Sequence, residues 1–432
     1  MILGVGFALA ALAFDPSPPA DHAPIEGSTA ISDAKAMIAS GRTSEARQLL
    51  EARLRLSQGD VDAHFLLGIL AASEGDYAAA IVHYQSALNG APNAPRIRLE
   101  LARTLYLAGK YGSAERQFRK ALAGHLPVEV ESGVHHFLEQ IRAQKTWTYD
   151  VGIAIAPDTN INGGSSVRDT LLFGLPFEFG RDARQRSGIG LATQAMVEYS
   201  PHLTSDVRLR IGAAVRRRDY KGVRFDDMSS SVSIGPRFNV HGWDLSLLAT
   251  GLARWYGGKS YQRAAGMRGE AIIFPARDTG LSLAAEWQRI RYTKSPAQDG
   301  SIMSISAGVI RIFSPASYGS LKVEVSRQKA LAPDLSNWSG IFSVEYSRDL
   351  THGITASIAP SIGLVRYDHP DVFFGRVRKD KSLELDVTLT NRSITLWRFH
   401  PTITYRHVQR RSTIDLFQNS QDRLEFGLAS AF

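Results

Sequence analysis

Three side chains within residues 135–139 have the types that could bind a metal ion: His135, His136 and Glu139. The surrounding sequence has helical periodicity, and adjacent side chains on an α-helix point about 100° apart. The two histidines are therefore poorly placed to chelate one ion together. A solvated helix face explains the three residues better, so we expect no metal site and no cofactor.

Motifs for covalent or phosphate chemistry are missing from the 432-residue sequence. It contains no phosphate-binding loop, no Gly-x-Ser-x-Gly elbow, no His-Glu-x-x-His pair and no cysteine. A barrel enzyme with a Ser-His-acid set gathered from distant segments stays open as an alternative. We expect a protein with no catalytic residues that is not an enzyme.

Charge and hydropathy narrow the class of protein. The net charge is +8 and the pI is about 9.6, but the arginines are spread through strand-like segments, which does not favour nucleic-acid binding. Mean hydropathy is −0.14. No apolar run approaches the ~20 residues of a membrane-spanning helix. A transmembrane barrel remains compatible, because its polar lumen face lowers the hydropathy of every strand.

From residue 146 onward, apolar and polar residues alternate with a period of two, which is typical of β-strands with one apolar face. In a barrel the apolar face contacts lipid and the polar face lines the lumen. The predicted lumen-lining residues include Arg208, Arg210, Arg216, Glu384 and Asp386. These arginines could favour anionic cargo, or they could be the ordinary charges of a barrel lumen; both interpretations stay open.

The connections between these strands alternate between short turns and longer polar loops. This pattern predicts about fourteen antiparallel strands over 146–432 that form an outer-membrane β-barrel, with short turns on the periplasmic side. The six tryptophans fall at or near strand ends, where interfacial aromatic residues belong. The last strand ends on Phe432, as a strand that closes a barrel can. A large β-sandwich would also alternate, but it would have no reason to alternate its loop lengths.

A 34-residue repeat precedes the strands. Gly41, Gly75 and Gly109 recur at this spacing, together with a small residue and an aromatic or leucine position. The pattern matches tetratricopeptide (TPR) repeats, so we expect an α-helical solenoid over 27–145, closed by a capping helix from residue 128. The fold class is thus α + β, with a TPR solenoid followed by a barrel.

The first helices of stacked TPR units line a concave groove that commonly binds peptide segments. The residues expected in this groove are Lys35, Phe65, Ile69, Arg96, Leu99, Arg103 and Tyr106. Apolar centres beside basic residues suit a peptide or an acidic chain end. Alternatively, these are ordinary solvent-facing residues of a spacer domain.

The first thirteen residues are mostly apolar, and Ala11-Leu12-Ala13 resembles a signal-peptidase site. We expect a signal peptide at 1–13 and a linker at 14–26. A short buried helix is the alternative, because no Lys or Arg precedes the apolar run.

A distinctive loop follows the first predicted strand and contains Pro157, Asp158, Asn160 and Asn162. The string Pro-Asp-Thr-Asn-Ile-Asn, placed between a short TPR domain and a C-terminal barrel, resembles the surface lipoprotein assembly modifier (Slam) family. The resemblance extends over nearly the whole chain.

The resemblance implies a translocator that moves client proteins to or across the cell surface, with surface lipoproteins and secreted haem- or metal-capture proteins among its clients. It implies that the TPR domain engages the client or a periplasmic chaperone. The expected partners are therefore a client protein or lipoprotein, the chaperone, the barrel assembly machinery and outer-membrane lipid, with no nucleic acid. The alternative is a TPR-linked exopolysaccharide export porin; a passive porin would leave the TPR domain unexplained.

Overall fold

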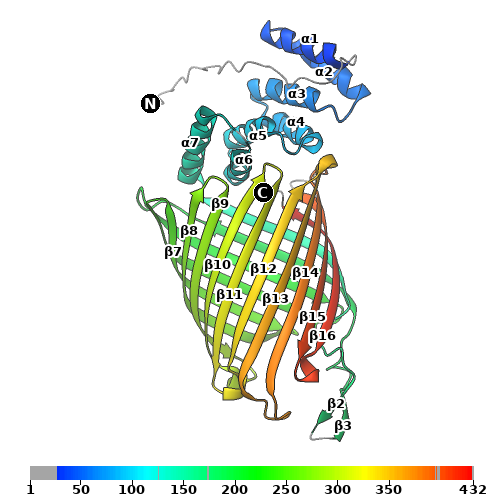
Figure 1. Ribbon diagram of the computed structural model, residues 1–432, viewed down its shortest axis with the longest axis vertical. Coiled ribbons are helices and arrows are strands. Elements are labelled where there is room, and N and C mark those ends of the chain that lie inside the picture. The colour runs from blue at the N-terminus through cyan, green and yellow to red at the C-terminus, as the bar shows by residue number, and fades with distance from the viewer. Residues whose placement is uncertain (1–26, 125, 173–174, 395, 397–398, 431–432) are drawn as a thin grey trace.

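A computed structural model describes residues 27–124, 126–172, 175–394, 396 and 399–430. The expected signal peptide, the linker, Trp397 and Phe432 lie outside these residues. A helical unit rests on one rim of a closed β-barrel, and we call this rim the helix-bearing end and the opposite rim the far end (Figure 1).

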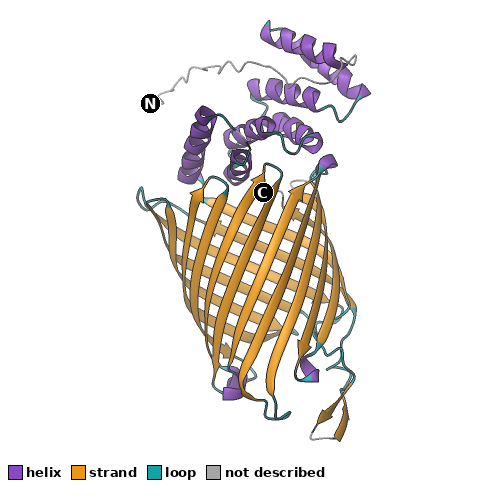
Figure 2. Cartoon of the chain, in the orientation of Figure 1, coloured by secondary structure: helices purple, strands orange, loops and turns teal. Residues whose placement is uncertain are grey.

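The described chain begins with helices only, coloured purple in Figure 2. They are α1 (Gly27–Ala39), α2 (Thr43–Leu56), α3 (Val61–Ser73), α4 (Tyr77–Gly90), α5 (Pro95–Leu107), α6 (Tyr111–Leu122) and α7 (Val128–Gln144). The first six form three hairpins, and α7 follows as the capping helix that the sequence predicts.

The repeated glycines make the three hairpin turns. Gly41, Gly75 and Gly109 have φ angles of +79°, +82° and +70°, a region in which a side chain is strained. Asp60 and Asp76 begin α3 and α4 by accepting hydrogen bonds from the backbone N–H groups of the third residue on. The period of 34 thus marks the same turn in each hairpin.

Small residues allow the helices of a hairpin to cross closely. A Cβ atom on Gly68 would lie 2.6 Å from the Tyr84 ring, so only glycine fits opposite this buried aromatic side chain. Ala34 and Ala102 hold the equivalent positions and are fully buried. The recurring small and aromatic positions therefore form the core of the solenoid.

The strands follow without further α-helices in the described residues. They are β1 (Trp147–Asp158), β2 (Asp169–Leu172), β3 (Leu175–Glu178), β4 (Gly188–Tyr199), β5 (Val207–Tyr220), β6 (Asp227–Val240), β7 (Trp243–Tyr256), β8 (Lys259–Ala276), β9 (Thr279–Tyr292), β10 (Gly300–Ser314), β11 (Ser317–Ala330), β12 (Asn337–Asp349), β13 (Ile354–Pro370), β14 (Val377–Asn391), β15 (Phe399–Ser412) and β16 (Asn419–Ser430).

Fourteen of these described strands form one closed antiparallel barrel, in the order β1, β16 down to β4, and back to β1. β1 pairs with β4 from Trp147↔Tyr199 to Asp158↔Gly188. On its other edge β1 pairs with β16, from Gly152↔Ala429 to Asp158↔Arg423, and we call this pairing the closing seam. The predicted fold class is confirmed.

The outer surface of the barrel is apolar. On β1, for example, Val151, Ile153 and Ile155 are 40%, 46% and 57% exposed, while the residues between them face inward. Such a continuous apolar exterior is expected where lipid replaces water. No helix among the described residues is long and apolar enough to cross a membrane.

The two rims differ in their connections. Two-residue turns at 241–242, 277–278 and 315–316 lie at the helix-bearing end, together with the 3₁₀ turn η3 (Thr351–Gly353) and a seven-residue connection at 200–206. Most connections at the far end have six or more residues, but the turn at 257–258 has two. The predicted loop at 157–186 contains the hairpin β2–β3 at this end (Figure 1). The sequence did not predict this hairpin, because its two four-residue strands pair only with each other.

Candidate functional site

The residues predicted for the groove lie on the first helices of the hairpins, α1, α3 and α5. Their side chains divide into two groups: Lys35, Arg96 and Arg103 are exposed, while Phe65, Ile69, Leu99 and Tyr106 are half-buried. The guanidinium of Arg96 lies 5.3 Å from the centre of the Phe65 ring. The structure thus places basic groups beside a partly exposed apolar surface.

Tyr106 is directed toward the capping helix. Its hydroxyl donates to Gln140 at 2.8 Å and accepts from Gln144 at 3.2 Å. Its ring packs edge-on against Phe137, with the centroids 5.2 Å apart. Tyr106 therefore positions α7, and the exposed basic residues are the better probes of the groove.

A buried ionic contact joins the helical unit to the barrel. Asp349, at the end of β12, lies 3.0 Å from Lys120 Nζ and 3.4 Å from an Arg98 guanidinium nitrogen. The side chains of Arg98 and Asp349 are only 1% and 4% exposed. Burial lowers the pKa of Arg98 to about 10, while the charge of Asp349 opposes this shift, so Arg98 remains charged at neutral pH.

Arg98 also donates to the carbonyl of Pro92 at 2.7 Å and to Gln117 at 2.6 Å. Three elements thus converge on the two terminal nitrogens of one guanidinium, while the buried Nε of Arg98 has no hydrogen-bond partner among the described residues. The sequence did not indicate a role for Arg98 or Lys120. The position of Arg98 beside the apolar Ile97 on a helix could have indicated that Arg98 is buried. Nothing in the sequence indicates its partner on the barrel.

Further contacts anchor the helices around the rim. Asn89 donates to Ser393 at 3.0 Å, in the turn after β14. Arg119 lies over the Phe274 ring at 3.7 Å, and Arg277 pairs with Glu131 of α7. The contacts therefore involve several strand ends, and the helical unit is fixed over the rim.

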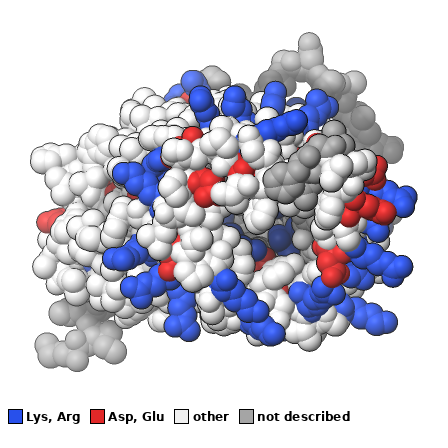
Figure 3. All heavy atoms as spheres, turned by 90° about the horizontal axis from the view of Figure 1, so that it is seen from below, with Lys and Arg blue, Asp and Glu red and all other residues white. Residues whose placement is uncertain are grey.

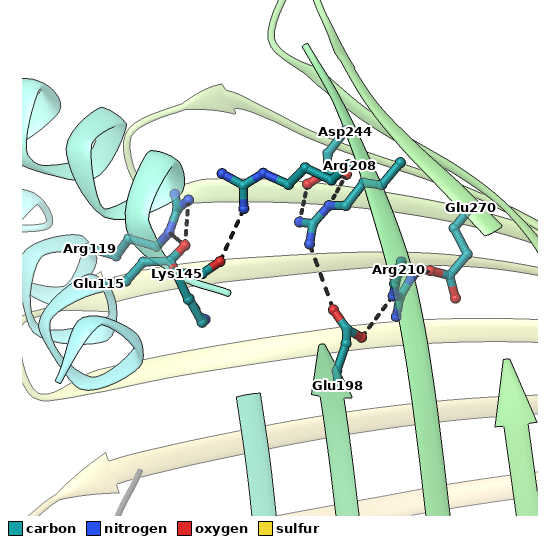
Figure 4. Close-up of polar contacts among 9 residues, drawn as sticks. Glu115, Arg119, Lys145, Glu198, Arg208, Arg210, Asp244 and Glu270 are labelled. Carbon is teal, nitrogen blue, oxygen red and sulfur yellow. Dashed lines mark hydrogen bonds and ion pairs between the residues drawn. The ribbon is translucent and has the colours of Figure 1, made fainter. Parts of the chain in front are cut away.

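The predicted lumen residues Arg208 and Arg210 lie near this rim (Figure 4). Arg208 donates to the backbone carbonyl of Lys145 at 3.2 Å, where the helical unit meets β1. Arg210 bonds Glu198 at 2.7 Å and also pairs with Glu270. Arg210 thus pairs with two glutamates, whereas Arg208 bonds a neutral carbonyl and has no ion pair within the described residues.

The other predicted lumen residues lie deeper in the barrel. Arg406 bonds Asp386 at 2.6 Å and Glu384 at 3.2 Å, so these two carboxylates share one positive charge. Arg216 lines a cavity of about 550 Å³ beside the closing seam. Among the residues that the structure describes, Arg216 has no ion-pair partner.

The loop after β1 locks the far end of the closing seam. Asp158 is buried and accepts hydrogen bonds from Arg423 at 2.8 Å and Gln421 at 2.8 and 2.9 Å, both on β16. It also accepts the backbone N–H of Asn160 at 2.8 Å. Pro157, which has no N–H, lies where the described β1–β16 register is interrupted between Ile155 and Asp158.

Two asparagines shape the rest of this loop. Asn160 is buried and donates to the carbonyls of Gly164 and Ser420, at 2.9 and 3.2 Å. Asn162 donates to the carbonyl of Arg184 at 2.8 Å and accepts from the N–H of Arg186 at 2.9 Å. The side chains of Asp158, Asn160 and Asn162 therefore join β1, the segment after β3 and β16.

Metal ligation is not supported by the arrangement of the described side chains. Within the described ranges, no three His, Asp or Glu residues are grouped so that they could hold an ion. His136 shares a hydrogen bond of 2.8 Å with Gln140 on α7.

Comparisons with known proteins cover both units. The sequence model of a family described as surface lipoprotein assembly modifier matches residues 147–427, and a tetratricopeptide repeat model matches residues 71–125. Surface lipoprotein assembly modifier 1 of Neisseria meningitidis is 24% identical over 90% of this chain and 80% of its own length.

Two further relatives align with a smaller share of this chain and of their own lengths. Surface lipoprotein assembly modifier of Moraxella catarrhalis is 23% identical over 71% of this chain and 60% of its own length. Surface lipoprotein assembly modifier 1 of Haemophilus influenzae is 19% identical over 78% of this chain and 70% of its own. The match to the surface lipoprotein assembly modifier family spans residues 147–427, which is nearly all of the barrel and more than half of the chain.

Proposed function

The chain belongs to the surface lipoprotein assembly modifier family, and on this premise we propose that it moves client proteins to or across the cell surface. The clients are surface lipoproteins or secreted haem- or metal-capture proteins. Its barrel lies in the outer membrane with the helical unit in the periplasm, so the far end of the barrel faces the outside.

One arrangement carries this proposal: a TPR unit fixed over the periplasmic rim of a closed barrel. The contacts with the rim come from α4, the start of α5, α6 and α7. The groove residues Lys35, Arg96 and Arg103 remain exposed. A client or chaperone bound in the groove would therefore be held next to the barrel mouth, which raises its local concentration there.

We assign the groove to a segment of the client or of a periplasmic chaperone. Basic side chains beside Phe65 suit an extended or helical segment with acidic and apolar residues. The chain contains no nucleotide-binding motif, and we propose that folding of the client outside the cell supplies the directionality of transport.

The test is a deletion strain in which surface proteins and culture supernatant are compared with the parent. We expect one protein or a small set to disappear from the surface or supernatant and to return with the plasmid-borne chain. A variant with Arg96→Glu and Arg103→Glu should restore at least tenfold less exported client, because charge reversal repels an acidic segment.

The matched control carries Arg42→Glu and Arg55→Glu, the same charge change on exposed residues outside the groove. It should restore export fully, and both variants should assemble equal amounts of barrel. Equal export by both variants would remove the groove from the mechanism. A deletion that leaves all surface proteins in place but abolishes a polysaccharide would instead support polymer export.

A further inference from the structure

The lipid-facing wall carries basic side chains near its far end. They stand opposite one another on an otherwise apolar face, where like charges repel. On β9, Arg289 and Arg291 share the outward face with Leu283 and Trp287, which are 53% and 50% exposed. Arg263 on β8 is the direct cross-strand partner of Arg291. Like charges placed directly opposite each other on a sheet repel and are destabilising.

The same pattern recurs on the other side of the barrel. Lys381 on β14 is the cross-strand partner of Arg411 on β15, and Arg366 on β13 is the partner of Lys379. These four residues are exposed and share their outward faces with residues such as Leu364, which is 56% exposed. Two separate groups of outward cations thus lie at the same level of the barrel.

Each group borders a hollow in the outer wall. The first hollow, of about 590 Å³, is bounded by Arg263, Arg289 and Arg291. Small residues leave room in its floor: Ser230, Gly251, Ala253 and Ala265 face outward beside the larger Val232. Apolar space next to guanidinium groups suits a ligand with an acyl chain and an anionic head group.

The second hollow has a volume of about 700 Å³ and the same construction. Gly340 forms its floor, between Val325 and Leu364 in one cross-strand row. Its basic residues are Arg366, Lys379, Lys381 and Arg411. Trp338 stands at its border and is 54% exposed, as expected for an aromatic residue at the membrane interface.

Within the part of the chain that the structure describes, these seven cations form no ion pair, and Asp368 attracts Arg366 only from beyond ion-pair distance. By contrast, Arg210, Arg254, Arg268 and Arg406 in the lumen all have a carboxylate within ion-pair distance. Elsewhere on the outer wall, Arg327 pairs with Asp368 and Arg311 with Asp278. Viewed from the far end, basic side chains project around the periphery of the barrel (Figure 3).

We propose that the two hollows bind the phosphorylated glycolipid of the outer leaflet, with its phosphate groups between the paired cations and an acyl chain in each hollow. Arginine forks match phosphate oxygens in pairs, and a phosphate between two cations turns their repulsion into attraction. The position decides the type of lipid: the hollows lie near the far end, which faces the outside, so the leaflet they contact is the outer one.

Native mass spectrometry of the purified full-length chain in detergent, with lipid A carrying both phosphates as the probe, tests this proposal. The unaltered chain should bind two lipid molecules. The variant Arg263→Gln, Arg289→Gln, Arg291→Gln should bind one, and so should Arg366→Gln, Lys381→Gln, Arg411→Gln. At an altered hollow the affinity should fall about 100-fold, since each cation adds to the attraction of an anionic lipid surface.

The matched control is Arg311→Gln with Arg348→Gln, two exposed outward arginines near the helix-bearing end, and it should still bind two lipids. Unchanged stoichiometry in both triple variants would overturn the proposal. Two further measurements use the unaltered chain and do not depend on whether a variant folds. If dephosphorylated lipid A or phosphatidylglycerol bound as tightly as lipid A with both phosphates, the proposal would also be overturned.

Discussion

At the scale of single residues, Asp158 explains what the distinctive loop does. It is fully desolvated and pairs with Arg423, whose side chain is only 6% exposed. A buried charge pair of this kind contributes little compared with an apolar pair, but loss of one partner is costly. Asp158 therefore keeps the far end of the closing seam in one arrangement.

We predict that Asp158→Ala destabilises the barrel by about 3–5 kcal/mol, because the buried Arg423 loses its nearest carboxylate and keeps only Glu425, at 3.8 Å. The temperature at which the folded band disappears in heat-modifiability electrophoresis should fall clearly. Asp219→Ala is the control: Asp219 pairs with the half-exposed Arg217, and loss of such an exposed pair should leave the melting temperature nearly unchanged. Equal melting of Asp158→Ala and the unaltered chain would contradict the assigned role.

At the scale of elements, the junction between α6, α7 and β1 depends on Glu115. This carboxylate lies 3.3 Å from Lys145 and 3.2 Å from Arg119 (Figure 4). Burial raises its pKa, but the two cations act more strongly together and the pKa of Glu115 is lowered below its ordinary value. The capping helix is thereby connected through Lys145 to the first strand.

The sign of the pH dependence follows from this shift. A carboxyl with a lowered pKa stabilises the folded state above its ordinary pKa of about 4.5, and this contribution is lost as the pH falls through the lowered value. The helical signal at 222 nm should therefore melt at lower temperature as the pH drops below 4.5. Glu115→Gln should lower the melting temperature at pH 7 and flatten this acid dependence; an unchanged pH slope would be the contrary result.

At the scale of the whole molecule, the helical unit and the barrel form one assembly. Asp349, Ser393 and Phe274 belong to three different strand ends, and each contacts a helix or the residue next to it. Most short contacts of this interface join residues more than 100 positions apart in the sequence. The solenoid is thus a fixed cover over part of the rim.

The sequence contains no cysteine, so crosslinking of two introduced cysteines tests directly whether the helical unit contacts the barrel rim. Asn89→Cys with Ser393→Cys should be joined in cells by a short thiol-reactive crosslinker, because the native side chains are 3.0 Å apart. The pair Lys35→Cys with Ser393→Cys should stay unjoined, since α1 lies farthest from the barrel in Figure 1. Failure of the first pair to react would show that the docked arrangement is not populated in the membrane.

The helical solenoid and the β-barrel could both be predicted from the amino-acid sequence, because both depend on local periodicity. The 34-residue spacing of Gly41, Gly75 and Gly109 marks backbone turns that only glycine makes without strain. Strict alternation over 146–432 follows from a wall with lipid on one side and polar groups on the other. These features need no knowledge of distant contacts.

Which side chains contact each other could not be predicted from the sequence. Arg210 and Arg216 look alike in the sequence, yet Arg210 is held by two glutamates and Arg216 lines a cavity. Tyr106 was predicted for the groove and contacts α7. Ion pairs and docking contacts depend on strand register and on how the solenoid meets the rim, and these are set by packing between segments that are far apart in the chain.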